Sequence, residues 1–260
     1  MKRLAQIWRY PVKSIGRERI ARASVEKGGK IPFDRHWAVL HEDSAKRLNG
    51  DSDALEEWLP KAAFLRGAAS PALQAIEGGL ESGKLKLRHP DQGEIIVDPS
   101  DEDDAASLIV WLAPLWPDDK PPPLKLVRGA EPLTDTRKPY ISINSLDSLS
   151  ALEAEVGQRL GVERWRGNLW IEGAEPFAEA DWIDREFTVG GLRMIGRQMI
   201  GRCSATAADT ETGQPDRDMI RALTEVTGQS DFGIYAEVLS GGDIAEMDEL
   251  ILSPSPEDSE

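Results

Sequence analysis

The sequence predicts a mainly β protein with a few helices, of the α+β class, built from two mainly β units. Three observations lead to this prediction. Short runs that alternate apolar and polar residues recur between glycine and proline turns, as in β-barrels and sandwiches. A proline-rich stretch near residue 120 interrupts the pattern and marks a linker. The chain has neither a GxGxxG motif nor a P-loop, which argues against a nucleotide-binding βαβ fold.

The first unit is expected to begin with three strands and a short helix. Alternating patterns predict strands at residues 4–12, 18–26 and 36–42. Leu55, Trp58 and Leu59 then recur at helical spacing after a capping-type residue. We therefore expect a short helix that starts at Ser52 or Asp53 and stops at Pro60, because proline cannot continue a helix.

Three more strands and a second helix complete this unit. Apolar runs bounded by turns predict strands at residues 73–76, 85–88 and 94–97. Acidic residues before an apolar run predict a helix from Asp101 to Ala113, because carboxylates favour the positive end of a helix. Consecutive prolines follow, and we place a domain boundary between Lys120 and Pro123.

The second unit is again expected to be rich in strands. The patterns predict strands at residues 124–127, 140–143, 167–173, 185–196 and 231–242. One helix is expected to begin near Ser145 and to end at a glycine cap, Gly157. The last residues are polar and acidic, which predicts disorder. The expected organisation is therefore a domain at 1–120, a domain at 121–250 and a disordered acidic tail at 251–260.

Charge and cysteine content exclude several classes of function. The net charge of −15 argues against nucleic acid as a partner. Residues 1–50 nevertheless hold 12 Lys and Arg against 5 Asp and Glu, so this basic segment is either a local anion site or a solvated face. The single cysteine, Cys203, excludes an intramolecular disulfide and a cysteine-based zinc site. No apolar run is long enough to span a bilayer, so we expect a cytoplasmic protein without a membrane partner.

Four short stretches carry side chains that suit an oxyanion or a metal. Lys13 and Ser14 follow a strand that ends at a proline in YPVKS, and Arg35 opens a strand in FDRHW. The segment RWRGN, residues 164–168, supplies two further arginines. Cys203 lies in RCSATAADTETG, where small residues leave space beside the thiol. A lone cysteine is most often a small buried hydrophobe, so this stretch alone leaves both interpretations open.

Together these stretches resemble the MOSC-domain proteins that carry a MOSC N-terminal β-barrel domain. That family includes the mitochondrial amidoxime-reducing components and the bacterial reductases of N-hydroxylated bases. YPVKSIG and FDRHWAVL match its N-terminal signatures, and RWRGNLWIEG, PFAEADW, RCSATAADTETG and FGIYAEV follow in the order of the MOSC domain. The resemblance covers nearly the whole chain, and it implies two β-barrel domains and a bound molybdenum cofactor.

The resemblance also implies the residues of the site. Cys203 would be the ligand of molybdenum and a catalytic residue, which suits a soft thiolate donor. The neighbouring Arg202 would favour the thiolate, and Asp209 would be a second catalytic residue that handles a proton. The residues implied to hold the cofactor are Lys13, Ser14, Arg35, Asn144, Ser145, Arg166, Asn168, Arg202 and Tyr235.

Four positions depart from the family pattern. Gly167 replaces a proline, Ile200 stands where many relatives have a second cysteine, and Gly201 replaces a residue that often bears a hydroxyl. Arg47 is the basic candidate where relatives often carry Thr-Gln-Arg. These departures concern the choice of substrate more than the binding of the cofactor.

The implied function is that of an oxidoreductase that reduces small N-hydroxylated compounds at a molybdenum cofactor. The chain has no flavin, haem or nicotinamide motif, so we expect a separate redox protein to deliver electrons, docking on Arg17, Arg19, Arg22 or Lys27. Two alternatives are a non-enzymatic carrier of the cofactor and a sulfur-transfer protein with a persulfide on Cys203. The family association with cofactor sulfurases also raises binding of pyridoxal phosphate, but 260 residues are too few for the domain that binds it.

Overall fold

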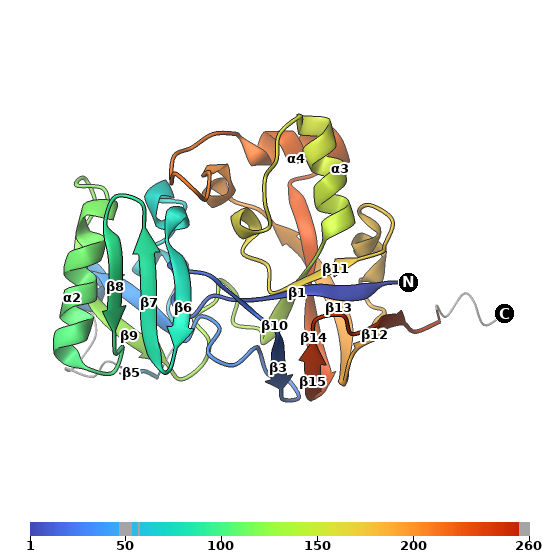
Figure 1. Cartoon of the computed structure of the whole chain (residues 1–260), viewed down its shortest axis with the longest axis horizontal. Helices are drawn as coiled ribbons and strands as arrows, with labels where there is room; N and C mark the ends of the chain where they lie inside the picture. Colours follow the sequence, from blue (N-terminus) through green and yellow to red (C-terminus); the bar gives the residue numbers. More distant parts are fainter. Residues whose placement is uncertain (47–53, 57, 255–260) are drawn as a thin grey trace.

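The structure is a computed structural model that describes residues 1–46, 54–56 and 58–254. Figure 1 shows two groups of strands side by side. One group contains β6 to β9 with helix α2 against it, and the other contains β1 and β10 to β14 with helices α3 and α4 beyond one end. This mixture of strands with a few helices confirms the predicted fold class.

The larger sheet has, in the described part of the chain, eight strands in the order β16-β12-β13-β14-β10-β11-β1-β2. Neighbouring strands are antiparallel, except that β10 and β11 are parallel. The strands are β1 (Arg3–Arg9), β2 (Glu18–Ile20), β10 (Tyr140–Ser145), β11 (Leu169–Glu172), β12 (Glu186–Val189), β13 (Leu192–Gly201), β14 (Asp231–Ser240) and β16 (Leu250–Leu252).

The two sides of this sheet meet and close it into a barrel. Leu4 N donates to Asp248 O over 2.8 Å, and Met247 N donates to Leu4 O over 2.7 Å. Leu250 N donates to Lys2 O over 2.9 Å, so the segment that leads into β16 pairs with β1. Closure satisfies backbone groups that an open sheet would leave unpaired at its edges.

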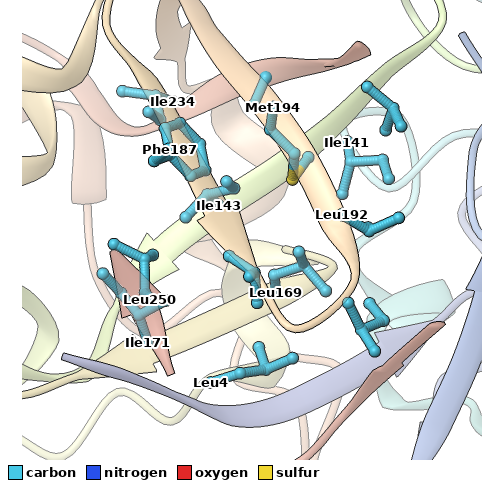
Figure 2. Close-up of a cluster of buried hydrophobic side chains, with 14 of the residues drawn as sticks. Leu4, Ile141, Ile143, Leu169, Ile171, Phe187, Leu192, Met194, Ile234 and Leu250 are labelled. Carbon is cyan, nitrogen blue, oxygen red and sulfur yellow. The ribbon is translucent and has the colours of Figure 1, made fainter. Parts of the chain in front are cut away.

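The barrel is filled by side chains from alternate positions of its strands. Figure 2 shows this cluster, which includes Leu4, Ile141, Ile143, Leu169, Ile171, Phe187, Leu192, Met194, Ile234 and Leu250. Each of these side chains is essentially inaccessible to solvent. Burial of a side chain of this size contributes about 1.5–3 kcal/mol, so the cluster is a principal source of the barrel's stability.

Two smaller sheets and helix α2 form the other core. One sheet has the order β4-β9-β5, with β4 (Trp37–His41), β9 (Pro123–Gly129) and β5 (Ala54–Leu55). The other contains β6 (Glu77–Glu81), β7 (Lys84–His89) and β8 (Gly93–Val97). Leu108 and Leu112 of α2 (Glu102–Leu112) pack with Leu85, Leu87 and Leu126 between these sheets. Elsewhere β3 (Arg22–Val25) pairs with β15 (Gly242–Ala245).

The longer helices begin at side chains that cap them. Asp101 caps α2, Ser145 caps α3 (Leu146–Val156) and Asp218 caps α4 (Met219–Thr227), each accepting a backbone N–H three residues later. The predicted Gly157 cap of α3 is confirmed, with a positive φ of 65°. Helix α4 likewise has a capping residue at its start, Asp218, and a glycine at its end, Gly228, but it was not predicted from the sequence. A short helix, α1 (Glu42–Ala45), follows β4.

Two secondary-structure predictions in the first unit are wrong. The helix expected between Ser52 and Pro60 is absent from its described part, where Ala54 and Leu55 form β5 parallel to β9. Leu55 and Leu59 instead pack in the small core beneath β4, which explains their apolar character. The strand expected at 73–76 is a 3-10 turn, Pro71–Ala75, because Pro71 favours a helical first turn.

The sheets do not separate at the expected domain boundary. Strand β9 follows that boundary but pairs with β4, and β1 pairs with β11. The division into residues 1–120 and 121–250 stays a prediction, and each part contributes a strand to a sheet of the other. The tail prediction is wrong for Ile251 and Leu252, which belong to β16. Residues 255–260 and Arg47 lie outside the described residues.

Replacement of a core phenylalanine is expected to test the barrel. Phe187→Ala removes a ring that is 0% exposed, so we expect the free energy of unfolding to fall by about 3–5 kcal/mol. Ile251→Ala on the neighbouring strand is a matched control, because Ile251 is 55% exposed and its loss is expected to cost less than about 0.5 kcal/mol. Denaturant unfolding of both variants measures the difference, and equal costs would contradict the described core.

Candidate functional site

A cavity of about 390 Å³ lies where the barrel meets the smaller sheets. Its volume falls within the usual range of small-molecule and cofactor sites. Both halves of the chain line it, since it gathers loops that follow β1 and β13 and loops that precede β4 and β11. The predicted site residues that line it are Lys13, Ser14, Arg35, Arg166, Asn168, Arg202, Cys203 and Tyr235.

Arg35 and Arg166 are brought together around the ring of Tyr10. The guanidinium carbons lie 4.7 and 4.4 Å from the ring centroid of Tyr10, which gives two cation–π contacts. Arg35 Nη2 donates to Arg166 O over 2.9 Å, and Tyr10 Oη donates to Gly167 O over 3.0 Å. Asp34 accepts from both the Tyr10 backbone N–H and the Arg35 guanidinium. These contacts join the N-terminal segment to the start of β11.

Three lining residues hold strained backbone conformations. Ser14, Arg35 and Arg166 have φ values of 62°, 51° and 49° although none of them is glycine. A left-handed conformation of this kind costs about 1–3 kcal/mol per residue and persists where the surroundings impose it. Strain of this kind tends to cluster at ligand-binding sites, and here it falls on three of the residues that the sequence analysis had selected.

The Arg166 guanidinium is only partly satisfied. Nη1 donates to Gly16 O over 3.1 Å, but the buried Nη2 has no partner among the described residues. Burial and then the charge of Arg35 lower the pKa of Arg166 to about 9. A buried donor without an acceptor costs about 1–3 kcal/mol. The site therefore offers positive charge and an unused N–H to an anionic ligand.

Lys13 is a further cation that lines the cavity. Its side chain is 6% exposed and its ammonium pairs with Asp135, whose side chain is 51% exposed. Burial lowers the pKa of Lys13, although the Asp135 carboxylate opposes this. Burial raises the pKa of Asp135, but the charge and hydrogen bond of Lys13, with the charges of Lys61 and Arg35, together outweigh it and lower the pKa. The pair is therefore a charged lysine and a carboxylate that reaches the solvent side of the cavity.

Cys203 lies between the end of β13 and a 3-10 turn, Ser204–Ala207. Its side chain is exposed, so the interpretation as a buried hydrophobe is wrong. Thr206 fixes the turn, since its N–H and hydroxyl both donate to Cys203 O, over 3.1 and 2.8 Å. The small residues that follow leave the thiol accessible from the cavity, as expected from the sequence.

Arg164 holds the same loop from below. Its Nη1 donates to Thr206 O over 3.0 Å, and its guanidinium makes two bonds of 2.7 Å to the Asp216 carboxylate. The Arg164 side chain is 1% exposed and the Asp216 side chain 22%, so this is a bidentate pair between a buried arginine and a partly exposed carboxylate. Partial burial works to raise the pKa of Asp216, but the hydrogen bonds and charge of Arg164 outweigh it and hold the pKa below its usual range. The pair fixes the position of the Cys203 loop.

Arg202 points to backbone carbonyls. Its guanidinium donates to Trp165 O over 2.8 Å and, through Nε, to Phe232 O over 2.9 Å. It also stacks on both of those aromatic rings. Burial lowers the pKa of Arg202 to about 10. Arg202 thus ties β13 to β14 behind the cavity while adding positive charge to its wall.

Asn168 and Tyr235 line the cavity in different ways. The Asn168 carboxamide is already used, because Oδ1 accepts from the Ser142 hydroxyl over 2.8 Å and Nδ2 donates to Trp8 O over 3.2 Å. Asn168 therefore fastens β10, β11 and β1 together. Tyr235 lies in β14 beside Tyr140, with ring centroids 6.0 Å apart. Burial raises the pKa of Tyr235, so its phenol keeps its proton.

Three of the selected residues lie outside the cavity lining. Ser145 is fully buried and caps α3 by accepting the Ser148 N–H over 3.2 Å. Asn144 is fully buried behind Gly167, and a Cβ at Gly167 would come within 2.1 Å of Asn144 Oδ1. Asn144 thus fills the space that the side chain of a residue at position 167 would need, and this chain has glycine there instead of the family's proline. Asp209 closes a turn by accepting from Glu211 N and from the Thr212 N–H and hydroxyl.

Several lining residues were missed by the sequence analysis. They come from the stretch that follows the expected helix and from the segment that runs into β10. These segments carry no motif, so tertiary folding alone brings them to the cavity. The missed lining residues are Lys61, Arg66, Gly67, Ala68, Gln74, Thr134, Asp135, Thr136, Tyr140 and Ser142.

The basic segment is only partly available for docking. Arg17 donates to Gln74 O over 2.6 Å, Ile76 O over 3.1 Å and Thr210 O over 3.0 Å, so it holds the two halves together. Arg19 pairs with Glu246. Arg22 and Lys27 are exposed. Among residues 1–46, 54–56 and 58–254 there is no helix long and apolar enough to cross a membrane. In the same ranges no three His, Cys, Asp or Glu side chains cluster as a metal site.

Loss of the Arg164 pair is expected to lower stability in a pH-dependent way. Arg164→Met removes the buried arginine of the pair and its bond to Thr206 O, so the free energy of unfolding near pH 7 should fall by about 1–3 kcal/mol. Because the folded pKa of Asp216 is depressed, this contribution is present above the ordinary carboxyl pKa and is lost as pH falls through the lower folded value. Denaturant unfolding at about pH 7 and about pH 3 measures the change.

A control for this variant is available on α4. Arg221→Met breaks an exposed pair with Glu225 and is expected to cost less than about 1 kcal/mol. A cost for Arg164→Met that is equal at both pH values would contradict the assigned role of the Asp216 pair.

Two family models match most of the chain. The model described as "MOSC N-terminal beta barrel domain" matches residues 1–113, and the model described as "MOSC domain" matches residues 133–251. Curated relatives include a molybdenum cofactor sulfurase from Anopheles gambiae, 25% identical over 279 residues, which cover 95% of this chain and 35% of that protein. A molybdenum cofactor sulfurase from Danio rerio is 36% identical over 77 residues, 28% of this chain and 9% of that protein. The chain thus spans about a third or less of these relatives.

Solved structures with some likeness to the chain come from bacteria. YiiM from Geobacillus stearothermophilus is 21% identical, with a TM-score of 0.36 over 44% of this chain and 54% of that chain. The YUAD protein from Bacillus subtilis is 11% identical, with a TM-score of 0.45 over 98% of both chains. Both TM-scores are below 0.5, and neither structure carries an argument about the site. On the two family models, the chain belongs to the MOSC-domain proteins that carry the MOSC N-terminal β-barrel domain.

Proposed function

We propose that this protein is a molybdenum-cofactor-dependent oxidoreductase that reduces small N-hydroxylated compounds. The observation that carries the proposal is a cavity lined both by an exposed thiol, Cys203, and by the buried Lys13 and the half-buried Arg35 and Arg166. A soft donor and an oxyanion-binding wall are the two features that a metal-bearing pterin phosphate requires. The family relationship and the cofactor sulfurases among its relatives support this choice of ligand.

The residues present fit such a cofactor. Two donors in the lining, Arg166 Nη2 and Trp165 Nε1, are buried and have no acceptor among the described residues. A phosphate and a ring edge bearing carbonyl and amide groups supply the acceptors that these groups lack. Lys13, Ser14 and Arg35 would hold the phosphate, and Arg166 would hold the ring edge. When bound, the cofactor supplies a metal centre capable of oxygen-atom transfer.

The protein's own groups would position the reactants. Cys203 would supply one sulfur ligand, held in place through Thr206 and Arg164. Reduction of an N–OH group to N–H consumes two electrons and two protons and releases water. Tyr235 keeps its proton and can donate a hydrogen bond into the cavity, a role that the sequence analysis had given to Asp209. Electrons would come from a separate redox protein, and the exposed Arg22 and Lys27 remain available for its docking.

A second candidate is sulfur transfer, in which Cys203 carries a persulfide. The similarity to molybdenum cofactor sulfurases favours it, since that similarity spans 95% of this chain. The exposure of the Cys203 thiol suits both candidates. A third candidate, a non-enzymatic carrier of the cofactor, would need only the binding wall. We propose a reducing cytoplasm as the compartment of this protein and a small N-hydroxylated compound as its substrate.

The serine variant of the cysteine is expected to separate these candidates. Cys203→Ser replaces a soft donor by a hard one, so protein produced in a cell that makes the cofactor should lose molybdenum or lose reduction of hydroxylamine by an artificial electron donor. The unfolding midpoint should be unchanged because the side chain is exposed. Full metal content with full turnover would rule out ligation by Cys203. Metal without turnover in the unmodified protein would favour the carrier.

Neutralisation of the binding wall is expected to weaken retention of the cofactor. Lys13→Ala and Arg35→Ala each remove a charge-assisted contact of about 1.5–3 kcal/mol, so molybdenum content after dialysis should fall in both. Arg193→Ala, an exposed cation on β13 outside the lining, serves as the control. Unchanged molybdenum content in both wall variants would remove the N-terminal part of the chain from the site.

A further inference from the structure

The cations of the cavity fall into two groups. Lys13, Arg35 and Arg164 pair with carboxylates, and Arg166 and Arg202 bond backbone carbonyls. Lys61 and Arg66 also line the cavity, but within the described ranges neither side chain makes a hydrogen bond or an ion pair, although the Lys61 charge helps to lower the pKa of Asp135. Lys61 is exposed and Arg66 is half-buried. They therefore form the solvent side of the cavity, whereas the buried cations form its inner wall.

The wall that carries Arg66 lies directly beside the loop of the thiol. A Cβ at Gly67 would come 2.0 Å from Gln74 Nε2 and 3.3 Å from the Cβ of Ala205. Gly67 thus lets the backbone of this wall approach both the Gln74 amide and the turn that follows Cys203. A larger residue at this position would push the wall away from that turn. Groups on this wall can accordingly reach a small molecule that reacts near Cys203.

Gln74 places a second donor without an acceptor in the lining of the cavity. Its side chain is 3% exposed, lines the cavity, and its Nε2 has no partner among the described residues. Arg66 and Gln74 line the same cavity, and among the described residues the guanidinium has no ion pair and the amide Nε2 has no acceptor. A carboxylate accepts several N–H groups at once and suits both donors. These two residues are distinct from Lys13, Ser14, Arg35 and Arg166, which the proposed function assigns to the cofactor.

We propose that the substrate carries a carboxylate in addition to its N–O bond, and that Arg66 and Gln74, with Lys61 at the rim, bind this carboxylate beside the Cys203 loop. The proposal rests on the proposed function and specifies the substrate class of the same cavity. It gives an ion-pair partner to two cations, and an acceptor to the Gln74 amide, which lack one among the described residues. It also gives a use to a wall for which the sequence analysis found no motif.

Two matched compounds test the proposal. Benzamidoxime is neutral and 4-carboxybenzamidoxime carries the carboxylate, so the ratio of their kcat/KM values reports the subsite. In the unmodified holoprotein the carboxylated compound should be preferred, and the preference should weaken with salt. Arg66→Gln should lower the ratio about tenfold, as expected for the loss of one charge-assisted contact. Gln74→Glu, which places a like charge at the subsite, should lower it further. Arg193→Gln, outside the lining, should leave it unchanged.

Two further measurements distinguish the ways in which the proposal can fail. Molybdenum content is determined for each variant, and a loss of metal in Arg66→Gln would mean that Arg66 holds the cofactor, which overturns the proposal. A ratio that does not change in Arg66→Gln would also overturn it. Binding of 4-carboxybenzamidoxime by calorimetry needs no turnover. If metal-loaded protein reduces neither compound, the proposed function fails, while binding that weakens about tenfold in Arg66→Gln would still support the carboxylate subsite.

Discussion

The clamp of Arg35 and Arg166 on the two sides of Tyr10 is the interaction on which the site depends. Tyr10 lies at the end of β1, Arg35 just before β4 and Arg166 just before β11, so one aromatic ring joins three separate segments. The Tyr10 hydroxyl bonds Gly167 O, and Asp34 holds the Tyr10 backbone and Arg35 together. Without this clamp the N-terminal loops would have no fixed position against the barrel.

The clamp also explains how an acidic protein keeps a positively charged cavity. Buried guanidinium groups are stable only where carboxylates, carbonyls or aromatic faces replace water. Asp34 does so for Arg35, whereas the Arg166 guanidinium has one carbonyl contact, to Gly16, one ring contact, to Tyr10, and one nitrogen without a partner among the described residues. The compensation is therefore incomplete at a residue that lines the cavity. An anionic ligand removes the deficit, which connects the packing of the two halves to what the site can bind.

The loop that carries Cys203 is positioned by a second set of contacts, an ion pair and hydrogen bonds instead of cation–π contacts. The buried Arg164 pairs with Asp216 and also donates to Thr206 O, and Thr206 in turn donates to Cys203 O. The thiol thus stays exposed while its backbone is fixed. Gly67 brings another wall of the cavity against the same turn. Two walls from distant parts of the chain therefore meet beside Cys203.

The sequence by itself determined the fold class, most strands, two of the capped helices and the motifs that hold Lys13, Arg35, Arg166 and Cys203. These follow from local causes: side-chain alternation, capping residues and residue chemistry. Two segments show where local reasoning fails. The expected strand at 73–76 is a 3-10 turn that starts at Pro71, and Leu55 of the expected helix lies in a short strand. In both cases the apolar residues face a core, and their spacing alone does not distinguish a helix, a strand and a turn.

Tertiary structure alone decided the rest of the site. It turned Ser145 and Asp209 into cap and turn residues and brought Arg66 and Gln74, which belong to no motif, to the cavity wall. The physical reason is that a cavity is formed by long-range packing. Closure of the barrel through Leu4 and Asp248, and the clamp around Tyr10, determine which side chains face one another. No local pattern in the sequence encodes those distances.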